Sequence, residues 1–267
     1  MLNLINKIAE TGPIVHIAPG VIFHIGNFSI TNSIFYGWLS AILIIFLLIW
    51  SARRMSIFPK KGFIQLVEVT AEFIINLVES SFEDKSKAKK YRPYFLTIFL
   101  FILLNNWLGL LPFVGEGFTL FGSPVLRPFT ADLNATLAMG LVTMVYVYYS
   151  SIKESGGFLK YLGHFFVGNP LNPLFFIIGL LEMITDITRV LSLSLRLFLN
   201  IAIGEIVIAV FSYLGHVLAP LTALPFTLIE LFVTALQAYI FTILAVMYLA
   251  IVVNHVTEEE DNQTETT

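Results

Sequence analysis

The chain has 267 residues, of which 57% are hydrophobic and 12% are charged. A soluble domain carries about 45–50% apolar and about 25% charged residues, so this composition excludes a soluble globular enzyme and indicates a polytopic membrane protein. The net charge of −3 offers no excess of basic residues for nucleic acid, and we expect no nucleic-acid partner. Because the chain has no cysteine, disulfides, zinc–thiolate sites and thiol nucleophiles are excluded.

Five apolar stretches are long enough to cross a bilayer, which takes about 20 helical residues. They predict an all-α polytopic protein with one membrane domain over residues 34–254. The predicted spans cover residues 34–52, 94–112, 131–150, 174–218 and 225–254. The fourth would be about 68 Å long, roughly twice the hydrocarbon thickness. We therefore expect the last two helices to form a long, strongly tilted hairpin through a Pro220–Pro225 turn.

Residues 62–82, between the first two spans, show a different pattern. Their polar residues recur at steps of 4, 4 and 3, which places them on one helical face. They are Glu68, Glu72, Asn76 and Glu79. The pattern predicts an amphipathic helix on the inner membrane surface, and a helix packed on a partner subunit is an equally good interpretation.

The distribution of lysine and arginine predicts the orientation. Residues 53–92 contain nine of them and the 151–170 loop adds two, whereas the opposite side has only Lys7 and Arg127. The positive-inside rule then places both basic segments in the cytoplasm. Residues 1–33 become an extracytoplasmic amino-terminal segment. Residues 255–267 become a cytoplasmic acidic tail, and we expect Val256 to Thr267 to be disordered.

Ionisable residues recur within the fourth stretch, although a charge at the centre of a membrane helix costs about 2.5–3.5 kcal/mol. Five polar residues spaced by 4, 3, 7 and 4 fall along one stripe, with Leu193 as an apolar link. They are Glu182, Asp186, Arg189, Arg196 and Asn200. Glu205 follows Arg196 by nine residues and falls on the opposite face.

The last helix carries a matching polar face formed by Glu230, Gln237 and Tyr248. Because this helix runs back inward, Glu205 and Glu230 both lie outside Arg196. The earlier acidic pair of the fourth stretch lies inside it. This arrangement predicts two offset aqueous paths separated by an arginine that stays protonated at physiological pH.

Simpler interpretations remain open for several of these residues. Glu182, Asp186 and Arg189 could form a local ion-pair ladder near the inner interface. Gln237 could make an ordinary interhelical hydrogen bond.

Two motifs resemble subunit a of bacterial F-type ATP synthases. They are SLSLRLFLNIAIGE (192–205) and LQAYIFTILAVMYLA (236–250). Three further segments are similar to recurrent parts of that family: ILLNNWLGLLPF (102–113), TADLNATLAM (130–139) and YYSSIKESGGF (148–158). The resemblance covers roughly residues 55–255.

The resemblance implies a stator subunit of the membrane sector, with two proton half-channels facing a rotating ring of c subunits. It implies that Arg196 faces the ring carboxylate. Gln237, Glu205, Glu230 and Asn200 match the family's channel and arginine-motif positions, and a basic residue is also usual at the position of Arg189. The implied partners are the c-ring, peripheral-stalk b subunits, the F1 ATPase sector and the lipid of a bacterial inner (plasma) membrane. No cofactor or metal is implied.

The alternatives are a stand-alone ion channel or secondary transporter, and a passive membrane anchor. The absence of an internal repeat disfavours a transporter, and the buried arginine disfavours an anchor. The chain contains no GxxxxGK[ST] motif, so we expect a non-catalytic subunit without a nucleotide site.

Overall fold

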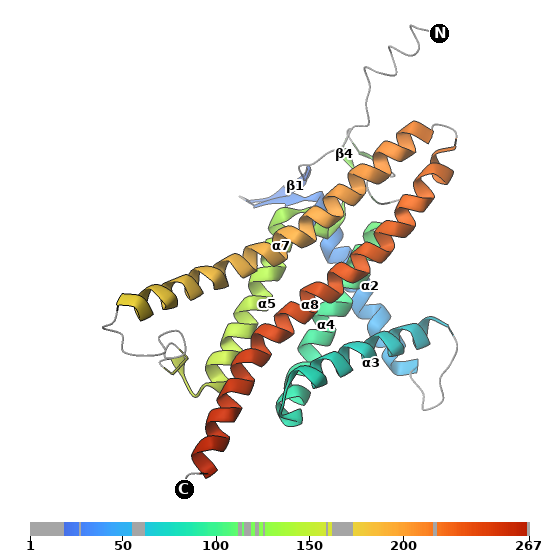
Figure 1. The fold of residues 1–267 in the computed structure, drawn as a ribbon. Coiled ribbons are helices and arrows are strands. Elements are labelled where there is room, and N and C mark those ends of the chain that lie inside the picture. The colour runs from blue at the N-terminus through green and yellow to red at the C-terminus, as the bar shows by residue number, and fades with distance from the viewer. Residues whose placement is uncertain are drawn as a thin grey trace. The chain divides into compact units, whose positions relative to one another are not determined.

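The computed structural model describes residues 19–26, 28–54, 62–111, 114, 119–120, 123–124, 126–158, 160–161, 173–215 and 218–265. Lys7, Lys60, Lys61 and most of the second inner loop lie outside these described residues. Most of the described chain is helical, as Figure 1 shows. The helices are α2 (Asn32–Arg54), α3 (Phe63–Ser81), α4 (Lys85–Gly109), α5 (Leu133–Glu154), α7 (Pro173–Gly215) and α8 (Ala219–Glu265).

Two short antiparallel hairpins interrupt the helical pattern and were not predicted. They are formed by β1 (Val21–Ile25) with β2 (Phe28–Thr31), and by β3 (Thr119–Leu120) with β4 (Ser123–Pro124). A 3-10 turn, η1 (Phe129–Ala131), leads into α5. The prediction of an all-α membrane fold is therefore right for the helical body, with small β-elements in the connecting segments.

Four helical segments among the described residues are long and apolar enough to cross a membrane. They are Asn32–Arg54, Leu133–Glu154, Thr188–Gly215 and Ala219–Thr257. They match four of the five predicted spans. The second predicted span begins within α4, whose first turns are rich in lysine and arginine. The apolar part from Tyr94 to Gly109 is about 24 Å long.

The last helix differs from its prediction at both ends. It begins at Ala219, so Pro220 lies in its first turn, where a missing backbone N–H costs nothing, and Pro225 lies inside the helix. It continues to Glu265, so the prediction of a disordered tail is wrong for residues 256–265. Residues 255–265 contain neither glycine nor proline, and their glutamates favour the helix.

The chain divides into two compact units, which we describe separately. The first contains residues Met1–Ile44, Leu103–Thr136 and Arg196–Gln237. In this unit the end of α7 and the start of α8 pack antiparallel (Figure 1). The Thr222 hydroxyl donates to the Phe211 carbonyl at 2.8 Å, and the Phe211 and Phe226 rings stack with centroids 3.7 Å apart. These contacts fix the register of the two helices.

The second unit contains residues Ile45–Ile102, Leu137–Leu195 and Ala238–Thr267. In it, α3 buries Val67, Ile74 and Val78, which share one helical face, while Glu72 and Asn76 on the polar face are exposed. The predicted helix over residues 62–82 is therefore present, with one apolar face packed.

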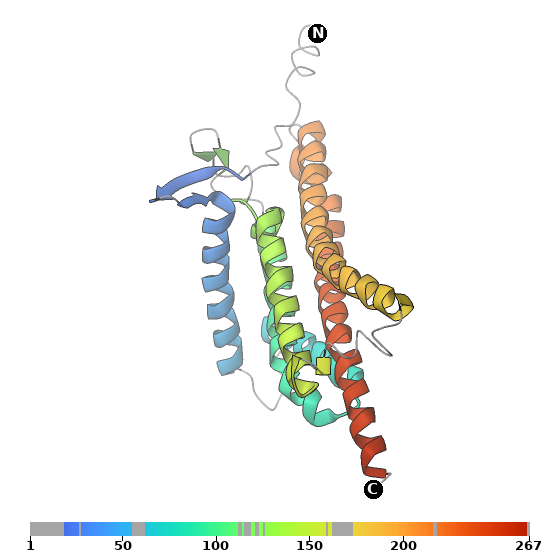
Figure 2. The same cartoon turned by 90° about the vertical axis from the view of Figure 1, so that its left-hand side faces the viewer.

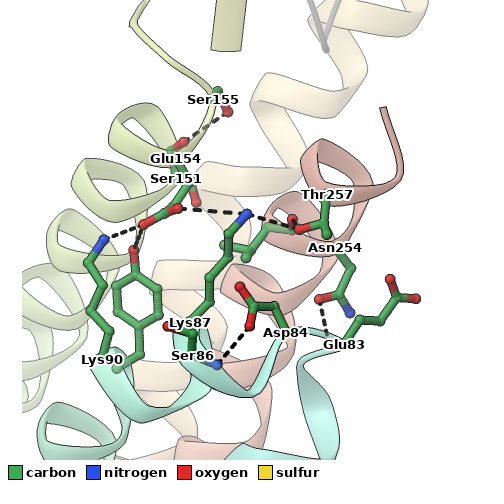
Figure 3. A network of polar contacts seen from close by, with 12 residues as sticks. Glu83, Asp84, Ser86, Lys87, Lys90, Ser151, Glu154, Ser155, Asn254 and Thr257 are labelled. Atoms are coloured by element: carbon green, nitrogen blue, oxygen red, sulfur yellow. Dashed lines mark hydrogen bonds and ion pairs between the residues drawn. The ribbon is translucent and has the colours of Figure 1, made fainter. Parts of the chain in front are cut away.

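A network of polar contacts joins three elements of the second unit (Figure 3). Glu154, at the end of α5, accepts a hydrogen bond from the Tyr91 hydroxyl at 2.5 Å and forms ion pairs with Lys90 and Lys87 of α4. Burial, together with the hydrogen bond to this carboxylate, raises the pKa of Tyr91. The tyrosine therefore stays protonated and donates.

Asn254 of α8 ties that helix to the turn between α3 and α4, as Figure 3 also shows. Its side-chain oxygen accepts the Glu83 backbone N–H at 3.2 Å, and its amide nitrogen donates to the Ser81 carbonyl at 3.1 Å. Lys87 adds a bond to the Thr257 hydroxyl at 2.9 Å. Main-chain and side-chain contacts thus hold α8 to the α3–α4 turn and to α4.

Candidate functional site

Arg196 stands in an exposed, apolar face of α7. Leu199 and Ile203, at helical spacing from it, are 47% and 56% exposed, whereas Leu197 and Ile201 are buried. The helix therefore turns Arg196 away from the packed side of the first unit. Within the described part of the chain, Arg196 makes no hydrogen bond or ion pair.

The described residues of the polar stripe predicted on α7 differ in exposure. Leu193, its expected apolar link, is buried, whereas Arg196 is exposed and Asn200 is half-buried. Three residues turn a helix by about 300°, so Leu193 lies about 60° away from Arg196. The described part of the stripe therefore follows the boundary between the buried and the exposed faces of α7.

Glycine at position 204 lets α8 approach α7 closely in the first unit. A Cβ placed on Gly204 would lie 2.2 Å from the carboxyl carbon of Glu230 and 2.3 and 2.5 Å from its oxygens. Glu230 is buried here, directly against the α7 backbone. The next residue of α7 is Glu205, and its carboxylate interacts electrostatically with that of Glu230. The two carboxylates predicted to share an outer path are therefore brought together.

Arg127, counted in the sequence only as a charge of an outer loop, joins this pair. It is buried, its guanidinium donates to the Ala131 carbonyl at 3.0 Å, and its charge interacts with that of Glu205. A buried charge is tolerated when opposite charges or hydrogen bonds compensate it. The signal available in the sequence was that Arg127 is a lone cation on the predicted outer side, which is otherwise almost free of basic residues.

Further polar groups of the first unit are buried without complete hydrogen bonding. Gln237, on the same face of α8 as Glu230, is 5% exposed. Its Nε2, the Oε1 of Glu230 and the Nδ2 of Asn200 have no hydrogen-bond partner among the described residues. An unpaired buried polar group costs about 1–3 kcal/mol, so these groups require a hydrogen-bond partner beyond the described residues.

Two adjacent asparagines of α4 were missed as candidates. Asn105 and Asn106 are fully buried, and none of their side-chain nitrogen or oxygen atoms is hydrogen-bonded within the described residues. The following residue, Trp107, donates its indole N–H to the Leu231 carbonyl at 3.2 Å, directly beside Glu230. Paired asparagines inside an apolar span were the signal that could have found them.

In the second unit, Arg189 and Tyr248 meet as a pair. The guanidinium carbon of Arg189 lies 4.6 Å from the centroid of the Tyr248 ring, which is a cation–π contact. Glu182 and Asp186 lie in α7, but their side chains fall outside the described residues. The predicted ladder between these acids and Arg189 therefore stays a prediction.

The first unit thus combines two carboxylates, a buried guanidinium and several amides. Such groups can pass protons and hold water. Within the described residues, no group of three or more His, Asp or Glu side chains could hold a metal ion.

Residues 34–250 match the family model described as ATP synthase A chain. "ATP synthase subunit a" of Anaeromyxobacter dehalogenans (strain 2CP-C) is 32% identical over 231 residues, which are 82% of this chain and 56% of that relative. "ATP synthase subunit a" of Chlorobium phaeobacteroides is 32% identical over 247 residues, 86% of this chain and 68% of the relative. "ATP synthase subunit a 2" of Chlorobaculum tepidum is 31% identical over 256 residues, 90% and 68% respectively. This chain therefore spans between about half and two thirds of its relatives' lengths.

Proposed function

The chain belongs to the ATP synthase A chain family, and on that premise we propose that it is the proton-translocating stator subunit of an F-type ATP synthase. In this role it provides two offset half-channels to a rotating c-ring. Each proton crossing 100 mV supplies about 2.3 kcal/mol, which the rotation delivers to ATP synthesis in the F1 sector. Peripheral-stalk b subunits hold the stator.

The outer half-channel runs past Glu205 and Glu230. Their proximity, the buried Arg127 beside them and the unpaired amide of Gln237 support a hydrated polar path in the first unit. Asn105 and Asn106 add further polar groups that need water. A proton taken up from outside passes along this path to a ring carboxylate.

The inner half-channel leads from the ring to the cytoplasm. Glu182, Asp186, Arg189 and Tyr248 belong to it, and the contact of Arg189 with Tyr248 supports the assignment. After nearly a full rotation, the proton leaves the ring by this route.

The position of Arg196 carries the proposal. It is an exposed cation within an apolar face, where contact with lipid costs about 2.5–3.5 kcal/mol. A partner that is apolar and carries a carboxylate removes this cost, and a c-ring is such a partner. Arg196 favours the ionised ring carboxylate and blocks direct passage between the two paths.

The topology follows the lysine and arginine distribution. Five spans cross the membrane, with α4 supplying the second, the amino terminus outside and the carboxyl terminus in the cytoplasm. The lengths of α7 and α8, 43 and 47 residues, support a strongly tilted hairpin. The helix α3 lies on the inner surface.

Replacing Arg196 tests the mechanism. Arg196→Ala abolishes ATP synthesis and ATP-driven proton pumping in membrane vesicles, because the fixed barrier charge is lost. Arg196→Lys also fails, since lysine lacks the planar fork and loses its proton when desolvated. Arg54→Ala, which removes an exposed arginine from the inner end of α2, is the matched control and keeps coupling. Normal synthesis in assembled Arg196→Ala complexes would overturn the proposal.

A further inference from the structure

The hairpin of β1 and β2 is amphipathic. In its register Phe23 pairs with Ile30 and His24 pairs with Ser29. Paired residues of neighbouring strands point to the same side, and successive pairs alternate sides. One side therefore carries Phe23 and Ile30, and the other carries His24 and Ser29, both exposed.

The apolar side of this hairpin is the side that faces the packed protein. Ile30 is 6% exposed, whereas Phe23, directly opposite it on the same side, is 40% exposed. The hairpin therefore extends beyond the part of the first unit that covers Ile30. Val21 and Ile22 are exposed as well, and Ile22 is the extra residue of an irregularity in the ladder.

The hairpin is fixed to the start of α2. Strand β2 ends at Thr31 and α2 begins at Asn32 without a linker. The buried Asn32 side chain accepts the backbone N–H of Gly20 at 3.1 Å, and the Asn32 N–H donates to the Gly20 carbonyl at 2.9 Å. Figures 1 and 2 both show the hairpin running crosswise to the first turns of α2.

The surface that continues from the hairpin along α2 is also apolar. Phe35, Trp38 and Leu39 are exposed on α2. Trp38 lies six residues from the start of the helix, which is about 9 Å along its axis. Tryptophans favour the membrane–water boundary, so the hairpin lies on the outer side of that boundary, at the level of the lipid headgroups.

We propose that the β1–β2 hairpin is an interfacial anchor that inserts Phe23 into the outer leaflet of the bilayer and leaves His24 and Ser29 in water. An isolated two-stranded hairpin is marginally stable in water, and burying its apolar side in lipid stabilises it. The choice of the outer leaflet rests on the proposed topology.

The test uses the absence of cysteine from the full-length chain. Single Phe23→Cys and Ser29→Cys variants are labelled with a nitroxide in vesicles of phosphatidylethanolamine and phosphatidylglycerol. Collision rates with oxygen, which concentrates in lipid, and with a water-soluble nickel chelate are measured by electron paramagnetic resonance. The ratio of oxygen to nickel accessibility should be several-fold higher for the Phe23→Cys label.

Three results would overturn the proposal in different ways. Nickel accessibility of the Phe23→Cys label as high as that of the Ser29→Cys label would mean that the hairpin lies in water. Low accessibility to both reagents would mean that a protein subunit or a second copy covers it. A membrane-impermeant maleimide that reacts with Ser29→Cys only from the cytoplasmic side would refute the outer leaflet and the proposed topology, whatever depth is measured.

Discussion

Gly204→Ala tests how closely the two helices of the site must approach. An alanine Cβ would lie 2.2 Å from the Glu230 carboxyl carbon, whereas ordinary van der Waals contact begins at 3.4 Å. The carboxyl group must therefore move by about 1.2 Å. It is the end of a flexible side chain, and an off-rotamer torsion costs about 0.5–1.5 kcal/mol. Alanine favours the helix by about 0.5–1 kcal/mol over glycine, so the two effects nearly cancel in stability.

The expected effect is on transport rather than on folding. A displacement of about 1 Å at a reacting group costs up to roughly 100-fold in rate, so we expect ATP-driven pumping to fall by about 10-fold to 100-fold. Pumping is measured by fluorescence quenching in inverted membrane vesicles. The amount of assembled complex is measured in the same membranes by native gel electrophoresis, and it should stay unchanged.

A second substitution separates this explanation from a general packing defect. Glu230→Asp shortens the side chain by one methylene and makes room for the added methyl group. The Gly204→Ala, Glu230→Asp double variant should therefore pump faster than Gly204→Ala alone. Full pumping in Gly204→Ala membranes, or failure of the complex to assemble, would refute the reasoning.

Three further predictions concern other parts of the molecule. Glu205→Gln and Glu230→Gln should each slow proton uptake from the outside. Because both act on one step, the fold-loss of pumping in the double variant should be smaller than the product of the two single fold-losses; a double loss equal to that product would contradict this. Asn254→Ala removes two hydrogen bonds worth about 0.5–1.5 kcal/mol each, so denaturant unfolding should show a loss of about 1–3 kcal/mol, which an unchanged midpoint would disprove. The helices α7 and α8 should tilt strongly in a bilayer, and oriented-sample spectroscopy that finds both within about 20° of the normal would exclude the tilted hairpin.

Local patterns predicted most of the helical body and indicated the candidate residues of the site. Apolar runs indicate membrane helices because a helix needs about 20 consecutive apolar residues to cross the hydrocarbon core. Arg196 was identified because a charge inside such a run is costly. Glu230 and Gln237 were assigned to one face from their spacing of seven, which is a property of one helix alone.

Contacts between distant segments could not be predicted in the same way. Arg127 belongs to the connection between α4 and α5, whereas Glu205 belongs to α7. The residue spacing within either segment does not show that their charges interact. A glycine inside an apolar helix has many uses, so Gly204 did not reveal that Glu230 lies against it. The β1–β2 hairpin occupies a stretch too short for a periodic signal.

The polar composition of the carboxyl terminus was misleading for a related reason. A short acidic segment resembles a disordered tail when considered alone. Here it continues a helix that is already formed, so the costly nucleation step is absent and each added residue extends an existing turn.

The bonds of Asn254 have a consequence for how the sequence can change during evolution. Both bonds end on main-chain atoms, the Glu83 N–H and the Ser81 carbonyl. Every residue except proline supplies the N–H at position 83, and every residue supplies the carbonyl at position 81. The joint between α8 and the α3–α4 turn therefore constrains the identity of one residue instead of three. Positions 81 and 83 can drift while Asn254 persists, so a comparison of distant homologues should show variability on one side of this contact and invariance on the other.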